Sequence, residues 1–184
     1  MATLFVDKID PQSGTSLEIG SSGDTITTAT GAKPSFLNPA FEAFLSASQD
    51  VSDFTTTKVQ FDSESFDTDN AYDNTTNYRF TPQVAGKYYV YAKVATDTIA
   101  GANLDQVRLF IQKNGTTVSK ANLDARGNTL GSYYSITDSV IVDLNGSTDY
   151  LEVYCRIDDT SGDPDFMGHA SDNVTSFGAY RIGS

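Results

Sequence analysis

The chain contains one histidine and one cysteine, and these are the first candidates for chemistry because a thiol beside an imidazole forms a nucleophile and its base. Cys155 lies in an alternating run and shares its parity with Val153 and Ile157, so we expect a buried, apolar side chain. His169 lies in a polar segment, where neither a cysteine pair nor a serine triad finds support. We therefore expect no catalytic residue and no enzymatic activity.

Carboxylates offer a second kind of chemistry, because they fall in two groups that no Lys or Arg interrupts. Paired acids can hydrolyse a glycosidic bond, and oxygen-rich loops can hold calcium. Neither group has the ligand spacing and closing glutamate of a calcium loop, so solvated acidic loops are the favoured interpretation, with calcium as the alternative to a chain without cofactor or metal. The two groups are Asp62, Glu64, Asp67, Asp69 and Asp73, and Asp158, Asp159, Asp163, Asp165 and Asp172.

Composition excludes several classes of partner. A formal net charge of -12 repels phosphate backbones and anionic membrane surfaces, so we expect no nucleic acid and no membrane as partners. No apolar run approaches the roughly 18 residues of a membrane span, and residues 1–5 do not have the pattern of a secretion signal. With 184 residues of which 39% are hydrophobic, the chain is long enough for one domain with a sizeable core and a short appendage.

The segments that would position these residues read as strands. In residues 78–94, aromatic and aliphatic residues alternate with polar ones on both sides of a Pro and Gly corner. Asn114-Gly115 between two alternating runs is a strong hairpin signal, because both residues tolerate positive φ. Further strands are predicted at 133–144, 150–157 and 177–182, with a polar loop at 95–105. Eight or nine short strands with regular turns predict an all-β sandwich or barrel.

Residues 38–47 are ambiguous. Asn38 and Pro39 are suited to the start of a helix, and Phe41, Phe44 and Leu45 have helical spacing. The same segment is equally consistent with a strand in which Phe41, Ala43 and Leu45 face inward. Local pattern does not choose between these alternatives.

Residues 1–36 differ from the rest of the chain, because short β-prone pieces alternate with Gly and Ser. Such pieces are too short to form a core alone. They form either a flexible leader or an arm that docks on another chain, and their content of β-branched residues favours the arm. The apolar residues expected to dock are Leu4, Val6, Ile9, Leu17, Ile19 and Ile26.

The order of landmarks after residue 38 resembles the globular heads of complement component 1q, which share the tumour-necrosis-factor-like (TNF-like) jelly roll. The matching segments are residues 39–43, 59–62, 72–73, 80–88, 109–115 and 177–180. The resemblance implies that 37–184 form a ten-strand jelly-roll domain which assembles as a homotrimer. It also implies that the ambiguous segment around Phe41 is the first strand.

A trimer would give the exposed tyrosines a role. The period-two argument directs them away from the core, and large amphipathic rings suit a subunit interface. The alternative is that they are scattered surface residues. The predicted interface residues are Tyr89, Tyr91, Tyr150, Tyr154 and Tyr180.

The leader resembles modular segments of fibre and decoration proteins from tailed bacteriophages. The matching segments are 7–10, 16–20 and 23–27. The resemblance implies a structural virion protein that is assembled in the host cytoplasm and anchored by residues 1–36 to capsid or tail proteins, with adhesion to a host surface glycan as a further role. The alternative is a glycan- or protein-binding recognition module that is not stably part of a virion.

Overall fold

The computed structural model describes residues 25, 30, 38–98, 104–126, 133–160 and 162–183. The chain divides into two units, Met1–Phe36 and Leu37–Ser184. The apolar residues predicted for the arm lie outside the described residues, so the arm stays a prediction. The strands and sheets below belong to the second unit.

The described residues form strands and turns, and none of them belongs to a helix that could cross a membrane. Eight strands have five or more residues: β1 (Ala40–Phe44), β4 (Ser63–Asp67), β7 (Gly86–Asp97), β8 (Leu104–Lys113), β9 (Thr116–Asp124), β10 (Tyr133–Leu144), β11 (Leu151–Asp159) and β13 (Ser176–Gly183). Five have two residues each: β2 (Gln49–Asp50), β3 (Thr57–Lys58), β5 (Tyr72–Asp73), β6 (Arg79–Phe80) and β12 (Asp165–Phe166).

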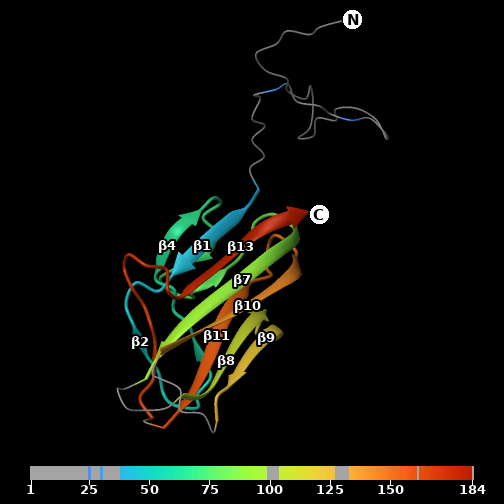
Figure 1. The fold of residues 1–184 in the computed structure, drawn as a ribbon. Helices are drawn as coiled ribbons and strands as arrows, with labels where there is room; N and C mark the ends of the chain where they lie inside the picture. Colours follow the sequence, from blue (N-terminus) through green and yellow to red (C-terminus); the bar gives the residue numbers. More distant parts are fainter. Residues whose placement is uncertain are drawn as a thin grey trace, which may run out of the picture. The chain divides into compact units, whose positions relative to one another are not determined.

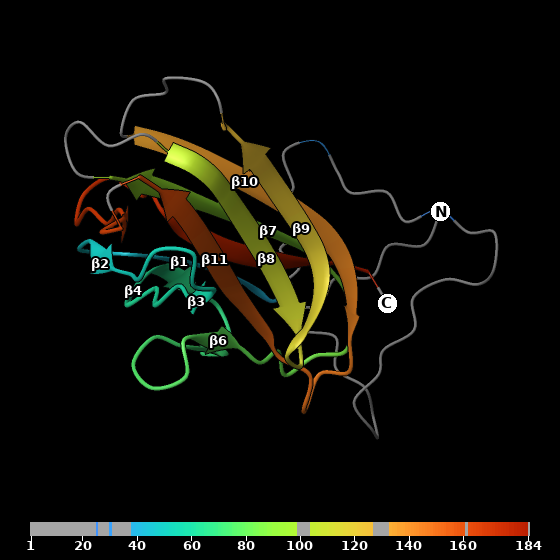
Figure 2. The same ribbon diagram turned by 90° about the horizontal axis from the view of Figure 1, so that it is seen from below.

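The strands form two antiparallel sheets. Sheet A has seven strands in the order β2-β12-β7-β13-β1-β4, with β10 paired to the other side of β7. Sheet B has six strands in the order β5-β6-β11-β8-β9, with β3 paired to β11. Figure 1 shows β1, β13, β7 and β10 side by side, and Figure 2 shows β11, β8 and β9 as a second layer. The prediction of an all-β sandwich is confirmed.

The core between the sheets settles the ambiguous first segment as a strand. In β1 the side chains of Phe41 and Ala43 are fully buried, and Leu45 follows with the same parity. The Phe41 ring stacks on Phe80 with centroids 4.3 Å apart and on Tyr72 at 5.0 Å. The contacts come from sheet B, so tertiary packing decides against the helical spacing.

The structure confirms the predicted hairpin and corrects the bounds of the predicted polar loop. Asn114 and Gly115 connect β8 and β9 with φ of 52° and 76°. The segment between the two strands is shorter than the loop predicted at 95–105, because β7 continues to Asp97 and β8 begins at Leu104. Pairing of β7 with β10 extends this far and satisfies backbone groups that the local pattern assigned to a loop.

Candidate functional site

Three of the five predicted interface tyrosines lie together on the outer surface of sheet A. Tyr89 and Tyr180 are cross-strand partners of β7 and β13, with ring centroids 5.3 Å apart. Tyr91 follows Tyr89 on the same side, at 6.3 Å between ring centroids. The register therefore brings residues about 90 positions apart in sequence into one aromatic cluster.

Apolar side chains extend this cluster along two neighbouring cross-strand rows. Ile141 of β10 pairs with Tyr89, and Phe66 of β4 lies in the row of Tyr91. Ile141 is 59% exposed, Phe66 48% and Tyr180 45%. We call the outward side chains of Tyr89, Tyr91, Tyr180, Ile141 and Phe66 the tyrosine face. Exposed apolar groups gathered on one sheet typically mark a contact surface.

A glycine allows Tyr91 to lie across the sheet. Gly178 of β13 stands between Tyr91 and Glu42 of β1 in the ladder. A Cβ atom at Gly178 would lie 2.4 Å from Cζ and Oη of Tyr91 and 2.9 Å from the carbonyl oxygen of Phe41. The ring therefore occupies the space that any side chain at this position would fill.

The Tyr91 ring ends in a hydrogen bond. Its hydroxyl donates to Oε2 of Glu42 at 2.8 Å. Oε1 of Glu42 accepts from Oγ of Ser65 at 3.1 Å and from Nδ2 of Asn173 at 2.9 Å. Burial raises the pKa of Tyr91 above its ordinary value, and the hydrogen bond to Glu42 raises it further. The single carboxylate within the two rows is thus held by three donors rather than left bare.

Sequence reasoning missed Glu42 and Gly178 as parts of this site. Both lie in segments that carried the family resemblance, at positions whose parity is opposite to that of the buried Phe41 and Phe177. Parity alone therefore signalled that both face outward. Only the register showed that they share a row with Tyr91.

The other two predicted interface tyrosines lie on the outer surface of sheet B. Tyr150 immediately precedes β11 and Tyr154 lies within it. The guanidinium of Arg79 lies 4.6 Å from the centre of the Tyr150 ring, and Nζ of Lys58 lies 5.6 Å from that of Tyr154. The structure therefore does not bring these two tyrosines together with the tyrosine face.

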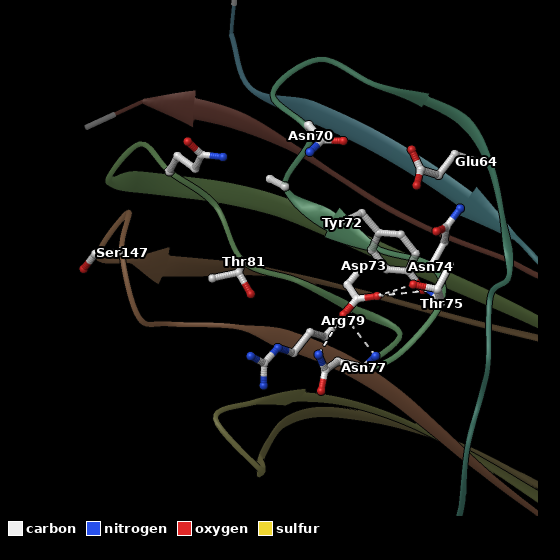
Figure 3. A pocket seen from close by; sticks show the side chains of 12 residues that line it. Glu64, Asn70, Tyr72, Asp73, Asn74, Thr75, Asn77, Arg79, Thr81 and Ser147 are labelled. Carbon is white, nitrogen blue, oxygen red and sulfur yellow. Dashed lines mark hydrogen bonds between the residues drawn. The ribbon is translucent and has the colours of Figure 1, made fainter.

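A polar hollow of about 520 Å³ lies beside Arg79 (Figure 3). It is lined by residues of β4, β5 and β6, by the loop before β5 and the turn after it, and by the residues that follow β6. Ser147, from the turn between β10 and β11, completes the lining. No local pattern in the sequence indicated that these separate turns would meet.

Asp73 fixes one wall of the hollow. Its carboxylate accepts hydrogen bonds from the backbone amides of Thr75, Thr76 and Asn77 and from both side chains of Thr75 and Asn77 (Figure 3). The bond from the Thr76 amide, with the others, lowers the pKa of Asp73 well below its ordinary value. The turn is consequently a preformed wall that depends on an ionised carboxylate.

Two other members of the first acidic group also hold the backbone. Asp67 accepts from the amides of Asp69, Ala71 and Tyr72. Asp62 accepts from the amide and hydroxyl of Ser46. These carboxylates organise loops, which accounts for their density without a bound ion.

One member of the second acidic group, Asp165, lies in a row of like charges. Asp165 of β12 pairs in register with Asp50 of β2 on one side and Asp97 of β7 on the other. Burial and the neighbouring Asp50 raise the pKa of Asp165. Among the described residues, no group of three or more His, Cys, Asp or Glu has the arrangement to hold a metal ion.

The candidates for nucleophilic chemistry lie in different environments. Cys155 is fully buried, and burial raises the pKa of its thiol far above the ordinary value. His169 is exposed and its Nδ1 lies 3.3 Å from the carboxylate of Asp172. A buried thiol that resists ionisation is a poor nucleophile.

Together, the two sheets and their connections define the class of fold as a TNF-like jelly roll. The structure of Eiger TNF from S. frugiperda is similar, with a TM-score of 0.53 and 14% identity over 81% of this chain and 94% of that chain. Murine APRIL at pH 5.0 is similar with a TM-score of 0.55 and 12% identity, over 79% of this chain and 100% of that chain. Neither a family model nor a curated protein matches the sequence.

At these identities the likeness concerns the fold alone. The predicted TNF-like jelly roll is therefore confirmed. The resemblance to complement component 1q heads and to phage fibre proteins is carried by sequence pattern and stays a prediction.

Proposed function

We propose that this protein is a non-enzymatic structural component of a bacteriophage virion. Its jelly-roll domain assembles as a homotrimer through the tyrosine face, and residues 1–36 anchor it to a capsid or tail protein. It is assembled in the host cytoplasm and resides in the virion.

The tyrosine face carries the proposal for self-association. It combines the exposed rings of Tyr180 and Phe66 with the exposed aliphatic side chain of Ile141 on the outer surface of sheet A. The chain has 24 acidic and 12 basic residues, so copies repel one another over most of their surface. The two rows of the tyrosine face contain one charged residue, Glu42, whose carboxylate has three donors. This is accordingly a surface at which copies can meet with little electrostatic cost.

The environments of the nucleophile candidates support a non-enzymatic role. Cys155 is enclosed in the core, and His169 is at the surface beside Asp172. Asp62, Asp67 and Asp73 of the first acidic group accept hydrogen bonds from backbone amides, which is a structural role. The proposed mechanism is association.

Sedimentation velocity on the full chain tests the trimer. We expect a trimer at micromolar concentration that dissociates when Tyr180 is replaced by Asp and persists when Tyr150 is replaced by Asp. A monomeric wild-type protein would overturn the proposed assembly.

Purified virions test the anchoring role. We expect the chain to be detected on particles by mass spectrometry and to occupy a threefold-compatible position in electron cryomicroscopy. Deletion of residues 1–36 should leave a soluble trimer that no longer joins particles. Unchanged incorporation of the truncated chain would assign the anchor to the jelly-roll domain instead.

A further inference from the structure

The polar hollow beside Arg79 has the size of a ligand site but an unusual lining. Its volume of about 520 Å³ falls in the range of roughly 300–1,000 Å³ for small-molecule sites, most of which are lined by apolar side chains. Here the lining consists largely of amide, hydroxyl and charged groups (Figure 3). A complementary ligand must therefore offer many hydrogen-bonding groups rather than apolar surface.

Several polar side chains at the hollow have unused hydrogen-bonding capacity. Among the described residues, the side chains of Asn70, Asn74 and Thr81 make no hydrogen bond, nor does the carboxylate of Glu64. Amides and hydroxyls both donate and accept, and Glu64 adds a further acceptor. This mixture suits vicinal hydroxyl groups, each of which is donor and acceptor in turn.

Among the described residues, Arg79 has no acidic partner. Its cross-strand neighbour Asp73 directs its carboxylate to its own turn, and no carboxylate in the described part of the chain forms an ion pair with Arg79. The guanidinium is instead stacked on Tyr150, 4.6 Å from the ring centre. Stacking holds the planar fork in place and covers a face of it rather than its edges, so its N–H groups stay available to a carboxylate in two parallel bonds.

We propose that this hollow binds an acidic saccharide, whose carboxylate is received by Arg79 and whose hydroxyls are bound by Asn74, Thr81 and Glu64. A polyphosphate is disfavoured, because Arg79 is the one cation among the described residues of the lining and stands with two carboxylates, Glu64 and Asp73. A peptide is disfavoured as well, because the hollow offers no apolar pocket for an aromatic or aliphatic anchor.

The hollow is independent of the proposed trimer contact. Its lining residues come from the β4–β7 region and the turn before β11, and none belongs to the tyrosine face. A trimer built on sheet A would therefore leave the hollow open. Saccharide binding and assembly are separable properties.

Saturation-transfer NMR and calorimetry test the proposal on the full chain. The probes are a panel of oligosaccharides containing glucuronic, galacturonic or sialic acid, each paired with its carboxyl-reduced form. We expect at least one acidic member to bind, and its reduced form to bind roughly tenfold more weakly or worse, which is the usual loss when a charged hydrogen bond is removed.

Variants locate the site. Arg79→Gln should abolish the preference for the acidic form, and Asn74→Ala should weaken both forms. Lys120→Gln, which removes one exposed positive charge from β9, is the matched control and should leave binding unchanged. Circular dichroism of each variant verifies that the domain is folded.

The proposal is overturned if no member of the panel binds, if the reduced forms bind as well as the acidic ones, or if Arg79→Gln binds as wild type does. Equal displacement of the sugar by inorganic phosphate at the same concentration would indicate a general anion site and overturn the assignment to a saccharide. The Tyr180→Asp variant should retain full affinity, so failure of the trimer and failure of saccharide binding are distinguishable.

Discussion

The outer surfaces of the two sheets use tyrosine in different ways. On sheet A, Tyr89 contacts Tyr91 and Tyr180, so rings adjoin rings. On sheet B, Tyr150 and Tyr154 each lie beneath a cation. A ring that adjoins other rings leaves apolar area for a partner, whereas a ring beneath a solvated cation is already covered. The residue type therefore does not define an interface, and the neighbours across the strands do.

A negative charge introduced on each outer surface in turn should produce the largest difference in association between the two sheets. Tyr180→Asp places a carboxylate in the row of Tyr89 and Ile141, and we expect association to weaken by roughly 2–4 kcal/mol, as for central interface residues. The measurement is the dissociation constant from sedimentation equilibrium.

Tyr150→Asp is the matched substitution on sheet B and should leave that constant unchanged. Equal weakening by both substitutions would remove the distinction between the two surfaces.

A methyl group at Gly178 tests how closely the tyrosine face is packed. Gly178→Ala would bring Cβ against Tyr91 and the backbone of Phe41, and overpacking of this kind costs about 1–3 kcal/mol in the free energy of unfolding. The measurement is urea denaturation. Gly183→Ala is the control on the same strand, since no atom lies within 4 Å of the added Cβ. A tolerated Gly178→Ala would mean that the Tyr91 ring moves freely.

The Tyr91 hydroxyl should contribute less to the free energy of unfolding than the packing of its ring against Gly178. Tyr91→Phe removes one donor to Glu42, and we expect a loss of about 1–2 kcal/mol in stability at pH 7. The unfolded chain releases the Tyr91 proton near pH 10.0, the ordinary pKa of tyrosine. In the folded protein burial and the hydrogen bond to Glu42 raise this pKa, so the proton stays bound at higher pH. The contribution of the Tyr91 hydroxyl to the free energy of unfolding is therefore fully present below pH 10.0 and is lost as the pH rises above it.

Denaturation curves from pH 8 to 11 measure this effect, and Tyr91→Phe should fall less steeply than wild type. Tyr154→Phe is the control on sheet B, where the hydroxyl makes a longer 3.5 Å contact with Glu152, and should cost less at pH 7. A Tyr91→Phe variant with the wild-type alkaline profile would contradict the role of this hydroxyl.

The cations of sheet B should have the smallest effect. Arg79→Met removes the guanidinium from Tyr150, and an exposed contact of this kind contributes about 0.5–1 kcal/mol. Thermal unfolding measures the loss, and the oligomeric state should not change. Dissociation of the trimer by this variant would place sheet B within the interface.

Much of the fold was predictable because its signals are local. The Asn114-Gly115 turn needs only two residues that tolerate positive φ, and the strand at 133–144 follows from alternation. Alternation also gives the side of a sheet on which a residue lies. It does not tell which sheet contains the strand, so Tyr150 and Tyr154 were grouped with Tyr89 although β11 belongs to sheet B.

The candidate sites depend on contacts that no local pattern records. Glu42, Tyr91 and Gly178 meet only through the register of β1, β13 and β7. The hollow beside Arg79 forms where separate turns converge, and Ser147 reaches it from a different hairpin. Long-range register of this kind is set by the packing of the whole sandwich.

The enclosure of Cys155 has a practical consequence for studying assembly. The chain's single thiol is buried between the sheets, so maleimide reagents should not react with it in the folded protein. One cysteine introduced at Lys120, which is exposed on β9 of sheet B and lies outside the tyrosine face, would then be the sole site of labelling. A fluorophore or spin label at that position would report distances between copies directly.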